Sequence, residues 1–128
     1  MSQASTRRRG QDAEAEAAAF LERRGLTIRE RNVEIGGGEL DLIATTDDDD
    51  VPTVVFIEVR SRADDRRGRP VETVGARKRQ QLRRAATAWL VARELWERVA
   101  VRFDVVGLTR ADGPPIIEWI PGAFDADE

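Results

Sequence analysis

Two short apolar segments carry carboxylates at positions flanked by residues typical of a buried core. The first is residues 38–43 (GELDLI) and the second is residues 54–60 (VVFIEVR). Side chains alternate between the two faces of a strand, so Glu39 and Asp41 share one face of the first segment. If the two segments are adjacent strands, the carboxylates of Asp41 and Glu58 lie close together on one side of a sheet.

A carboxylate within such an apolar run is costly to bury unless something compensates its charge. A divalent cation is one compensation, because Asp and Glu are the oxygen ligands that Mg²⁺ prefers. An ion pair is the other, and Arg60 is a candidate partner for Asp41. The residues alone leave the metal site and the structural ion pair both open.

The flanking chain is strongly basic although the net charge of the protein is -3. Residues 60–84 hold ten basic side chains and three acidic ones. A basic stretch beside paired carboxylates favours a polyanion bound around a metal site, whereas the simpler alternative is a solvated charged surface. On the first interpretation, the residues expected to flank the site and contact phosphates are Arg62, Arg66, Arg67, Arg69, Lys78 and Arg79.

Composition excludes several kinds of chemistry. The chain has no cysteine and no histidine, which excludes disulfides, cysteine nucleophiles and Ser-His-Asp triads. Its 128 residues fit one domain, with 41% hydrophobic and 35% charged residues. There is no apolar run long enough to span a bilayer and no signal-peptide pattern, so we expect a cytoplasmic protein without a membrane partner.

The spacing of apolar residues predicts a single α/β domain over residues 10–121, between a flexible basic tail (1–9) and an acidic tail (122–128). Helices are predicted over residues 10–24 and 76–95, and a loop over residues 62–74. The predicted strands cover residues 26–35, 39–46, 53–61, 99–108 and 116–120.

Both predicted helices place a charged residue on their apolar side. Lys78 begins the stripe that continues through Leu82 and Trp89, and Glu14 shares a face with Leu21. Taken singly, a lysine near a helix end that extends to solvent, or a glutamate favoured by the helix dipole, explains each residue. Together with the two strands, however, four elements direct polar groups to one side of the sheet.

This arrangement resembles the restriction-endonuclease-like, or PD-(D/E)XK, nuclease fold and, more closely, the YraN family of small bacterial proteins. The likeness covers almost the whole domain. It includes Gly10, Glu14 and Ala17, then Arg31-Asn32, residues 38–43, residues 56–60, Arg62, Gly68, Pro70 and the helix near Lys78.

The resemblance implies a core of helix, three strands, helix and strand around a mixed central sheet. It also implies an Mg²⁺ or Mn²⁺ ion held by Asp41, Glu58 and the backbone carbonyl of Val59. Glu14 would lie nearby, as a similar helix glutamate does in the distantly similar archaeal Holliday-junction resolvases. Such a site hydrolyses DNA phosphodiester bonds, and we expect branched or otherwise structured DNA as the substrate.

The chain departs from the nuclease pattern at the third motif position, where Arg60 replaces the usual lysine. Arginine grips a phosphate oxygen well but stays protonated at any working pH. Lys78 could take over the role from the neighbouring helix. The sequence therefore leaves two functions open: a metal-dependent endonuclease, with Asp41, Glu58, Arg60, Lys78 and Glu14 as catalytic residues, and a DNA-binding module that has lost cleavage. A homodimer is also left open.

Overall fold

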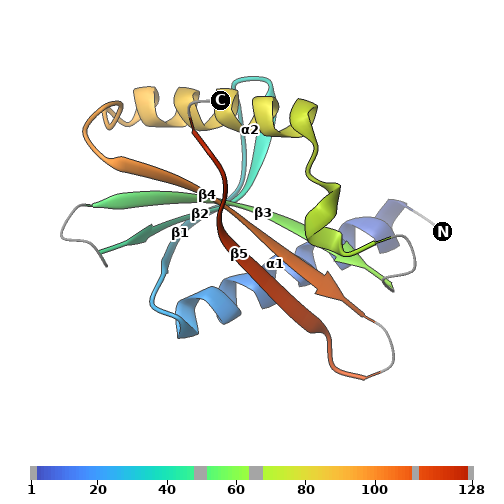
Figure 1. Ribbon diagram of the computed structural model, residues 1–128. Helices are drawn as coiled ribbons and strands as arrows, with labels where there is room; N and C mark the ends of the chain where they lie inside the picture. Colours follow the sequence, from blue (N-terminus) through green and yellow to red (C-terminus); the bar gives the residue numbers. More distant parts are fainter. Residues whose placement is uncertain (1–2, 48–51, 64–67, 111–112, 127–128) are drawn as a thin grey trace.

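The computed structural model describes residues 3–47, 52–63, 68–110 and 113–126, with side chains from residue 12 onward. A five-stranded sheet lies between helix α2 on one face and helix α1 on the other (Figure 1). In chain order the elements are α1 (Gln3–Arg23), β1 (Thr27–Ile35), β2 (Gly38–Thr46), β3 (Thr53–Arg62), a 3₁₀ turn (Pro70–Thr73), α2 (Ala76–Ala92), β4 (Ala100–Thr109) and β5 (Ile116–Phe124).

The sheet is mixed and its strand order is β1-β2-β3-β4-β5. Strands β3 and β4 pair in parallel and are joined by the α2 crossover, whereas the other neighbouring pairs are antiparallel. This helix, three-strand, helix, strand order is the restriction-endonuclease-like core that the sequence predicted, with β5 added at the edge.

Large apolar side chains fill the space between the sheet and α2. Phe56 of β3 lies at the centre of this core, with its ring 5.7 Å from Trp89 and 5.6 Å from Phe103. The α2 stripe that supplies Leu82 and Trp89 also includes Lys78 one turn earlier, so the helix that builds this core also carries a cation to the sheet.

Small side chains fill the space between the sheet and α1. Ala13, Ala17 and Ala18 are completely or almost completely buried, together with Leu21. Because alanine adds little bulk, the helix backbone can lie close to the sheet, and Glu14 is carried in with it. None of the described helices is both long and apolar enough to cross a membrane.

The 3₁₀ turn fixes where α2 begins. Gly107 of β4 lies under this turn, and a Cβ there would be 3.0 Å from Pro70 Cβ and 3.0 Å from Val71 Cγ1. Only glycine therefore allows this close approach without displacement. The turn occupies part of the predicted 62–74 loop and leads directly into the helix that carries Lys78.

Three predicted boundaries were wrong. Helix α1 begins at Gln3, where a tail over residues 1–9 was predicted, because no proline interrupts the run and Gly10 alone does not break a helix. Helix α2 ends at Ala92, three residues earlier than predicted, and Glu94 then adopts a left-handed φ of 59°.

The third error is at the C-terminal end, where β5 continues through Pro121 and Gly122 to Phe124, although the predicted strand ended at residue 120. An edge strand tolerates a proline because one side of its ladder needs no donor. The Gly122 N–H instead donates to the buried Asp104 carboxylate over 2.9 Å.

Candidate metal and phosphate site

The alternation of β2 side chains between the two faces of the sheet is interrupted at Asp41. Leu40 and Ile43 both pack in the core beneath α2, whereas Leu42 and Ala44 pack in the core beneath α1. A strict two-residue alternation cannot place positions 40 and 43 on the same face, so the alternation shifts by one residue between them. Asp41 lies within this shift and is therefore directed by a local twist of the strand as well as by its periodicity.

The β2–β3 ladder stops at the same point. Its last pair toward the site is Leu42 with Ile57, which leaves the next residues of β3 without a β2 backbone partner in the ladder. The Asp41 carboxylate takes that place, because its Oδ2 accepts the Val59 N–H over 2.9 Å. The position of Asp41 is thus set by the backbone of the strand that carries Glu58.

Asp41 and Glu58 lie close enough to interact directly through their side chains. Glu58 is 5% exposed, and its Oε2 has no hydrogen-bond partner among the described residues. Burial, followed by the charge of Asp41, raises the pKa of Glu58 to about 8. Burial is also the main reason that the pKa of Asp41 is raised. Two carboxylates that resist ionising together are poised for a bound cation.

Two cations flank Glu58 on the α2 side. Arg60 Nε is 3.4 Å and Lys78 Nζ is 3.8 Å from Glu58 Oε1. Both distances are those of ion pairs, and the Arg60 Nε has no hydrogen bond of good geometry within the described part of the chain. Lys78 therefore reaches the site from α2, as the helical stripe predicted.

The structure corrects one alternative for Arg60. The sequence offered an Arg60–Asp41 ion pair as the structural explanation of both charges, but Arg60 pairs with Glu58. Asp41 instead accepts a backbone N–H from Val59. The role of the Val59 carbonyl as a metal ligand stays a prediction.

Glu14 approaches the same carboxylates from α1. Burial, followed by the charge of Asp41, raises its pKa to about 7. Ligand oxygens of Glu14, Glu39 and Asp41 all lie within 4.8 Å of one another. Sequence reasoning gave Glu39 no role, although its position two residues before Asp41 on the same predicted face was the available signal.

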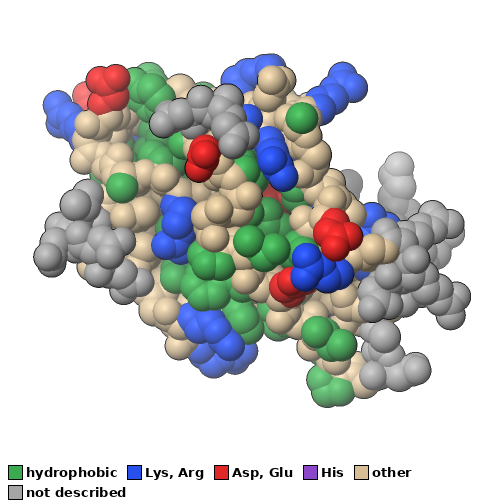
Figure 2. Space-filling view, viewed as in Figure 1, with side chains coloured by type: hydrophobic (Ala, Val, Ile, Leu, Met, Phe, Trp, Pro, Cys, Tyr) green, Lys and Arg blue, Asp and Glu red, His purple; other side chains and the backbone are tan. Residues whose placement is uncertain are grey.

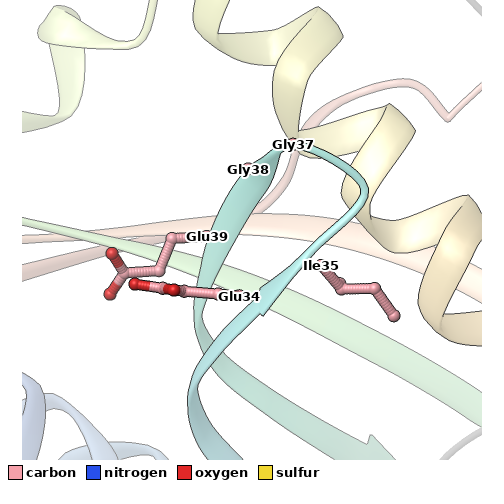
Figure 3. Close-up of a pocket in the computed structure, with 5 residues that line it drawn as sticks. All are labelled: Glu34, Ile35, Gly37, Gly38 and Glu39. Carbon is pink, nitrogen blue, oxygen red and sulfur yellow. The ribbon is translucent and has the colours of Figure 1, made fainter.

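The β1–β2 hairpin beside this cluster is acidic. Glu34 and Glu39 are cross-strand partners, and their side chains lie side by side, whereas Ile35 points away (Figure 3). They line an open depression of about 550 Å³ together with Ile35, Gly37 and Gly38. The candidate site thus has acidic groups on its hairpin side and basic groups on its α2 side.

The predicted phosphate-binding arginines are only partly brought to this site. Arg69 pairs with Glu118 over 2.6 Å and with Glu72 over 3.0 Å. Arg79 donates to the Val74 carbonyl over 3.1 Å and lies 5.4 Å from the ring of Phe124. Both therefore contact groups other than Glu58, a placement that strand and helix periodicity alone did not reveal.

The remaining basic residues give a mixed result. Arg62 is half-buried at the end of β3, two residues beyond Arg60, whereas Arg66 and Arg67 lie outside the described residues. In the view of Figure 2, basic side chains are interspersed with acidic and apolar ones over the described surface, and do not form one continuous basic patch.

Comparison with known proteins decides the family. Residues 13–108 match the family described as "Uncharacterised protein family UPF0102". The chain belongs to the UPF0102 family, also called the YraN family. It is 43% identical to a UPF0102 protein of Marinobacter nauticus over 99% of this chain and all of the relative.

Two further relatives show the same extent of similarity. A UPF0102 protein of Anaeromyxobacter dehalogenans is 44% identical over 92% of this chain and 84% of its own length. One of Pseudomonas aeruginosa is 43% identical over 95% of this chain and 96% of its own length. The family resemblance inferred from the motifs is therefore confirmed.

Proposed function

We propose that this UPF0102 protein is a divalent-metal-dependent nuclease that hydrolyses phosphodiester bonds in branched or otherwise structured DNA. The observation that carries the proposal is the Asp41–Glu58 pair, whose side chains interact at the point where β2 and β3 separate. Asp41 is half-buried, whereas Glu58 is buried and one of its oxygens has no hydrogen-bond partner among the described residues. A divalent cation bound between the two carboxylates would compensate their charge.

The residues present fit Mg²⁺ or Mn²⁺. The available ligands are oxygens of Asp41 and Glu58, with Glu14 at the margin and the Val59 carbonyl as the predicted further ligand. Buried Oε2 atoms of Glu14 and Glu58 have no hydrogen-bond partner within the described residues. When bound, the ion would neutralise charge on the scissile phosphate and lower the pKa of an attacking water.

The chain's own cations would bind and orient the phosphate. Arg60 and Lys78 side chains are 32% and 33% exposed, so both reach the solvent from which DNA would approach. Arg60 provides a planar donor pair for phosphate oxygens, and Lys78 provides a mobile point charge. Arg62 lies two residues after Arg60 in β3 and would contact the neighbouring phosphate of the DNA backbone.

A second function is favoured by the replacement of lysine with Arg60. A permanently protonated guanidinium cannot take a proton from the attacking water, so a site that needs this step would bind DNA without cleaving it. On that account the protein is a nucleic-acid-binding module that keeps the nuclease fold.

Cleavage assays on linear, flapped and four-way DNA with Mg²⁺ or Mn²⁺ test the proposal. We expect weak activity that rises in Arg60→Lys, falls in Lys78→Ala and vanishes in Asp41→Asn, which keeps the shape of the site. DNA affinity, measured in parallel, should change little in Arg60→Lys, because this substitution keeps the positive charge.

The same assays can decide against the enzyme. If Arg60→Lys cleaves none of these substrates while it still binds DNA in a salt-dependent manner, the binding module stands. If neither the unmodified protein nor the Arg60→Lys variant binds DNA even at low salt, both proposed functions are wrong.

A further inference from the structure

Asn32 has an unusual backbone conformation in the middle of strand β1. Its φ is 52°, in the left-handed region, although the residue is not glycine and no turn is present. Asparagine is among the residues that tolerate this region, and such conformations persist only where the surrounding structure stabilises them. The feature therefore requires an explanation in the neighbouring contacts.

The register places Asn32 opposite Asp41. Its neighbours Arg31 and Val33 pair with Leu42 and Leu40, so the intervening residues Asn32 and Asp41 face each other across the two strands. This is also the position at which β2 shifts its alternation between the two cores. The departures from regular geometry in the two strands thus coincide beside the candidate site.

The Asn32 side chain reaches the third carboxylate of the site. Its amide lies close enough to the Glu14 carboxylate to lower the pKa of that carboxyl by hydrogen bonding. Glu14 Oε2 is buried and has no hydrogen-bond partner among the described residues. The Asn32 amide is therefore placed to orient the Glu14 carboxylate, and Oε2 is available to a cation beside Asp41.

We propose that Asn32 is a positioning residue, which uses its left-handed backbone to hold Glu14 so that Oε2 is presented to a cation beside Asp41. The inference rests on the proposed metal site. It follows the general pattern in which an outer partner fixes the orientation of a ligating carboxylate, and loss of such partners typically weakens metal binding 10–100-fold.

A purely conformational role for Asn32 makes a different prediction. If the residue were present only because the backbone needs a left-handed φ, glycine would serve equally well. Asn32→Gly keeps the backbone conformation accessible and removes the amide, so it separates the two roles. Asn32 is exposed, which makes this variant compatible with folding.

The first experiment detects the contact without any metal. We expect the Asn32 side-chain amide signals in ¹H–¹⁵N spectra to shift in Glu14→Ala. They should not shift in the matched control Glu16→Ala, because Glu16 lies on the same helix but pairs with Arg110. If the Asn32 amide signals do not shift in Glu14→Ala, the proposal is wrong.

The second experiment measures Mn²⁺ affinity by calorimetry. Asn32→Gly should bind Mn²⁺ roughly 10-fold more weakly than the unmodified protein, and should add no further loss in a Glu14→Ala background. Equal affinity in Asn32→Gly overturns the positioning role and leaves the proposed function intact. Absence of Mn²⁺ binding in the unmodified protein overturns the proposed function and the positioning role together, while the spectra still report the contact.

Discussion

Asp104 and Glu58 are both buried carboxylates on adjacent strands, but their surroundings differ. Asp104 is 0% exposed and accepts two hydrogen bonds from Arg102, one from the Trp119 indole and one from the Gly122 N–H, at 2.9–3.0 Å. Glu58 is almost as buried, yet one of its oxygens has no partner within the described residues, and its two cations lie at 3.4 Å and 3.8 Å.

The difference separates a structural carboxylate from a functional candidate. Hydrogen bonds from Arg102, Trp119 and Gly122 satisfy the Asp104 carboxylate, and these contacts link β4 to β5 across their bulge. Glu58 is left incompletely satisfied beside a second carboxylate. Burial alone therefore says little about function, whereas the completeness of the hydrogen bonding distinguishes the two sites.

The largest expected effect concerns Asp104. Asp104→Ala should lower the free energy of unfolding by about 3–5 kcal/mol, because it removes the buried carboxylate that accepts hydrogen bonds from Arg102, the Trp119 indole and the Gly122 N–H. Urea unfolding monitored by tryptophan fluorescence measures this loss. Mn²⁺ binding by the folded fraction should be unchanged. A loss below 1 kcal/mol would show that the network contributes little.

Asp41→Asn should instead raise the free energy of unfolding. The substitution removes a charge that repels Glu14 and Glu58, and the amide oxygen can still accept the Val59 N–H. We expect the metal-free protein at pH 8 to gain about 1–2 kcal/mol in urea unfolding, and to lose Mn²⁺ binding. A comparable loss of stability would assign Asp41 the same structural role as Asp104.

The pH dependence of stability tests the same carboxyl groups together. In the folded protein, the pKa of Glu14 is raised from 4.5 to about 7 and that of Glu58 from 4.5 to about 8. The folded state therefore holds protons that the unfolded chain has lost, so the free energy of unfolding of the metal-free protein should fall as pH rises through this range.

Thermal unfolding between pH 4.5 and 8.5 measures that decline. Adding Mn²⁺ should reduce this loss of stability most at the highest pH, where the carboxylate ligands are ionised. Asp41→Asn should flatten the metal-free profile. A stability that rises over this range would mean that the carboxylates are stabilised in their charged form, as structural ion pairs are.

The smallest effect concerns the acidic hairpin. Glu34→Gln removes one of two like charges that face each other across β1 and β2, and should raise stability by roughly 0.2–1 kcal/mol. The gain should shrink at high salt, and Glu97→Gln, at an exposed residue after α2, serves as the control. No gain at low salt would indicate that another group already compensates the Glu34–Glu39 pair.

Much of the fold followed from the sequence because its signals are local. The alternation of β3 and the apolar stripe of α2 were sufficient to place Glu58 and Lys78 together. The shift at Asp41 was not predictable, because it coincides with the left-handed backbone of Asn32 in another strand. The ion pair between Arg69 and Glu118 was equally hidden, since it joins residues 49 positions apart.

Anomalous diffraction from crystals soaked in Mn²⁺ tests the central claim most directly. The account predicts a Mn²⁺ peak in contact with carboxylate oxygens of both Asp41 and Glu58, and no peak in Asp41→Asn crystals soaked in the same way. No peak at millimolar Mn²⁺, with Glu58 still paired to Arg60 and Lys78, would contradict it. A peak held by Glu14, Glu39 and Asp41 without Glu58 would contradict it equally.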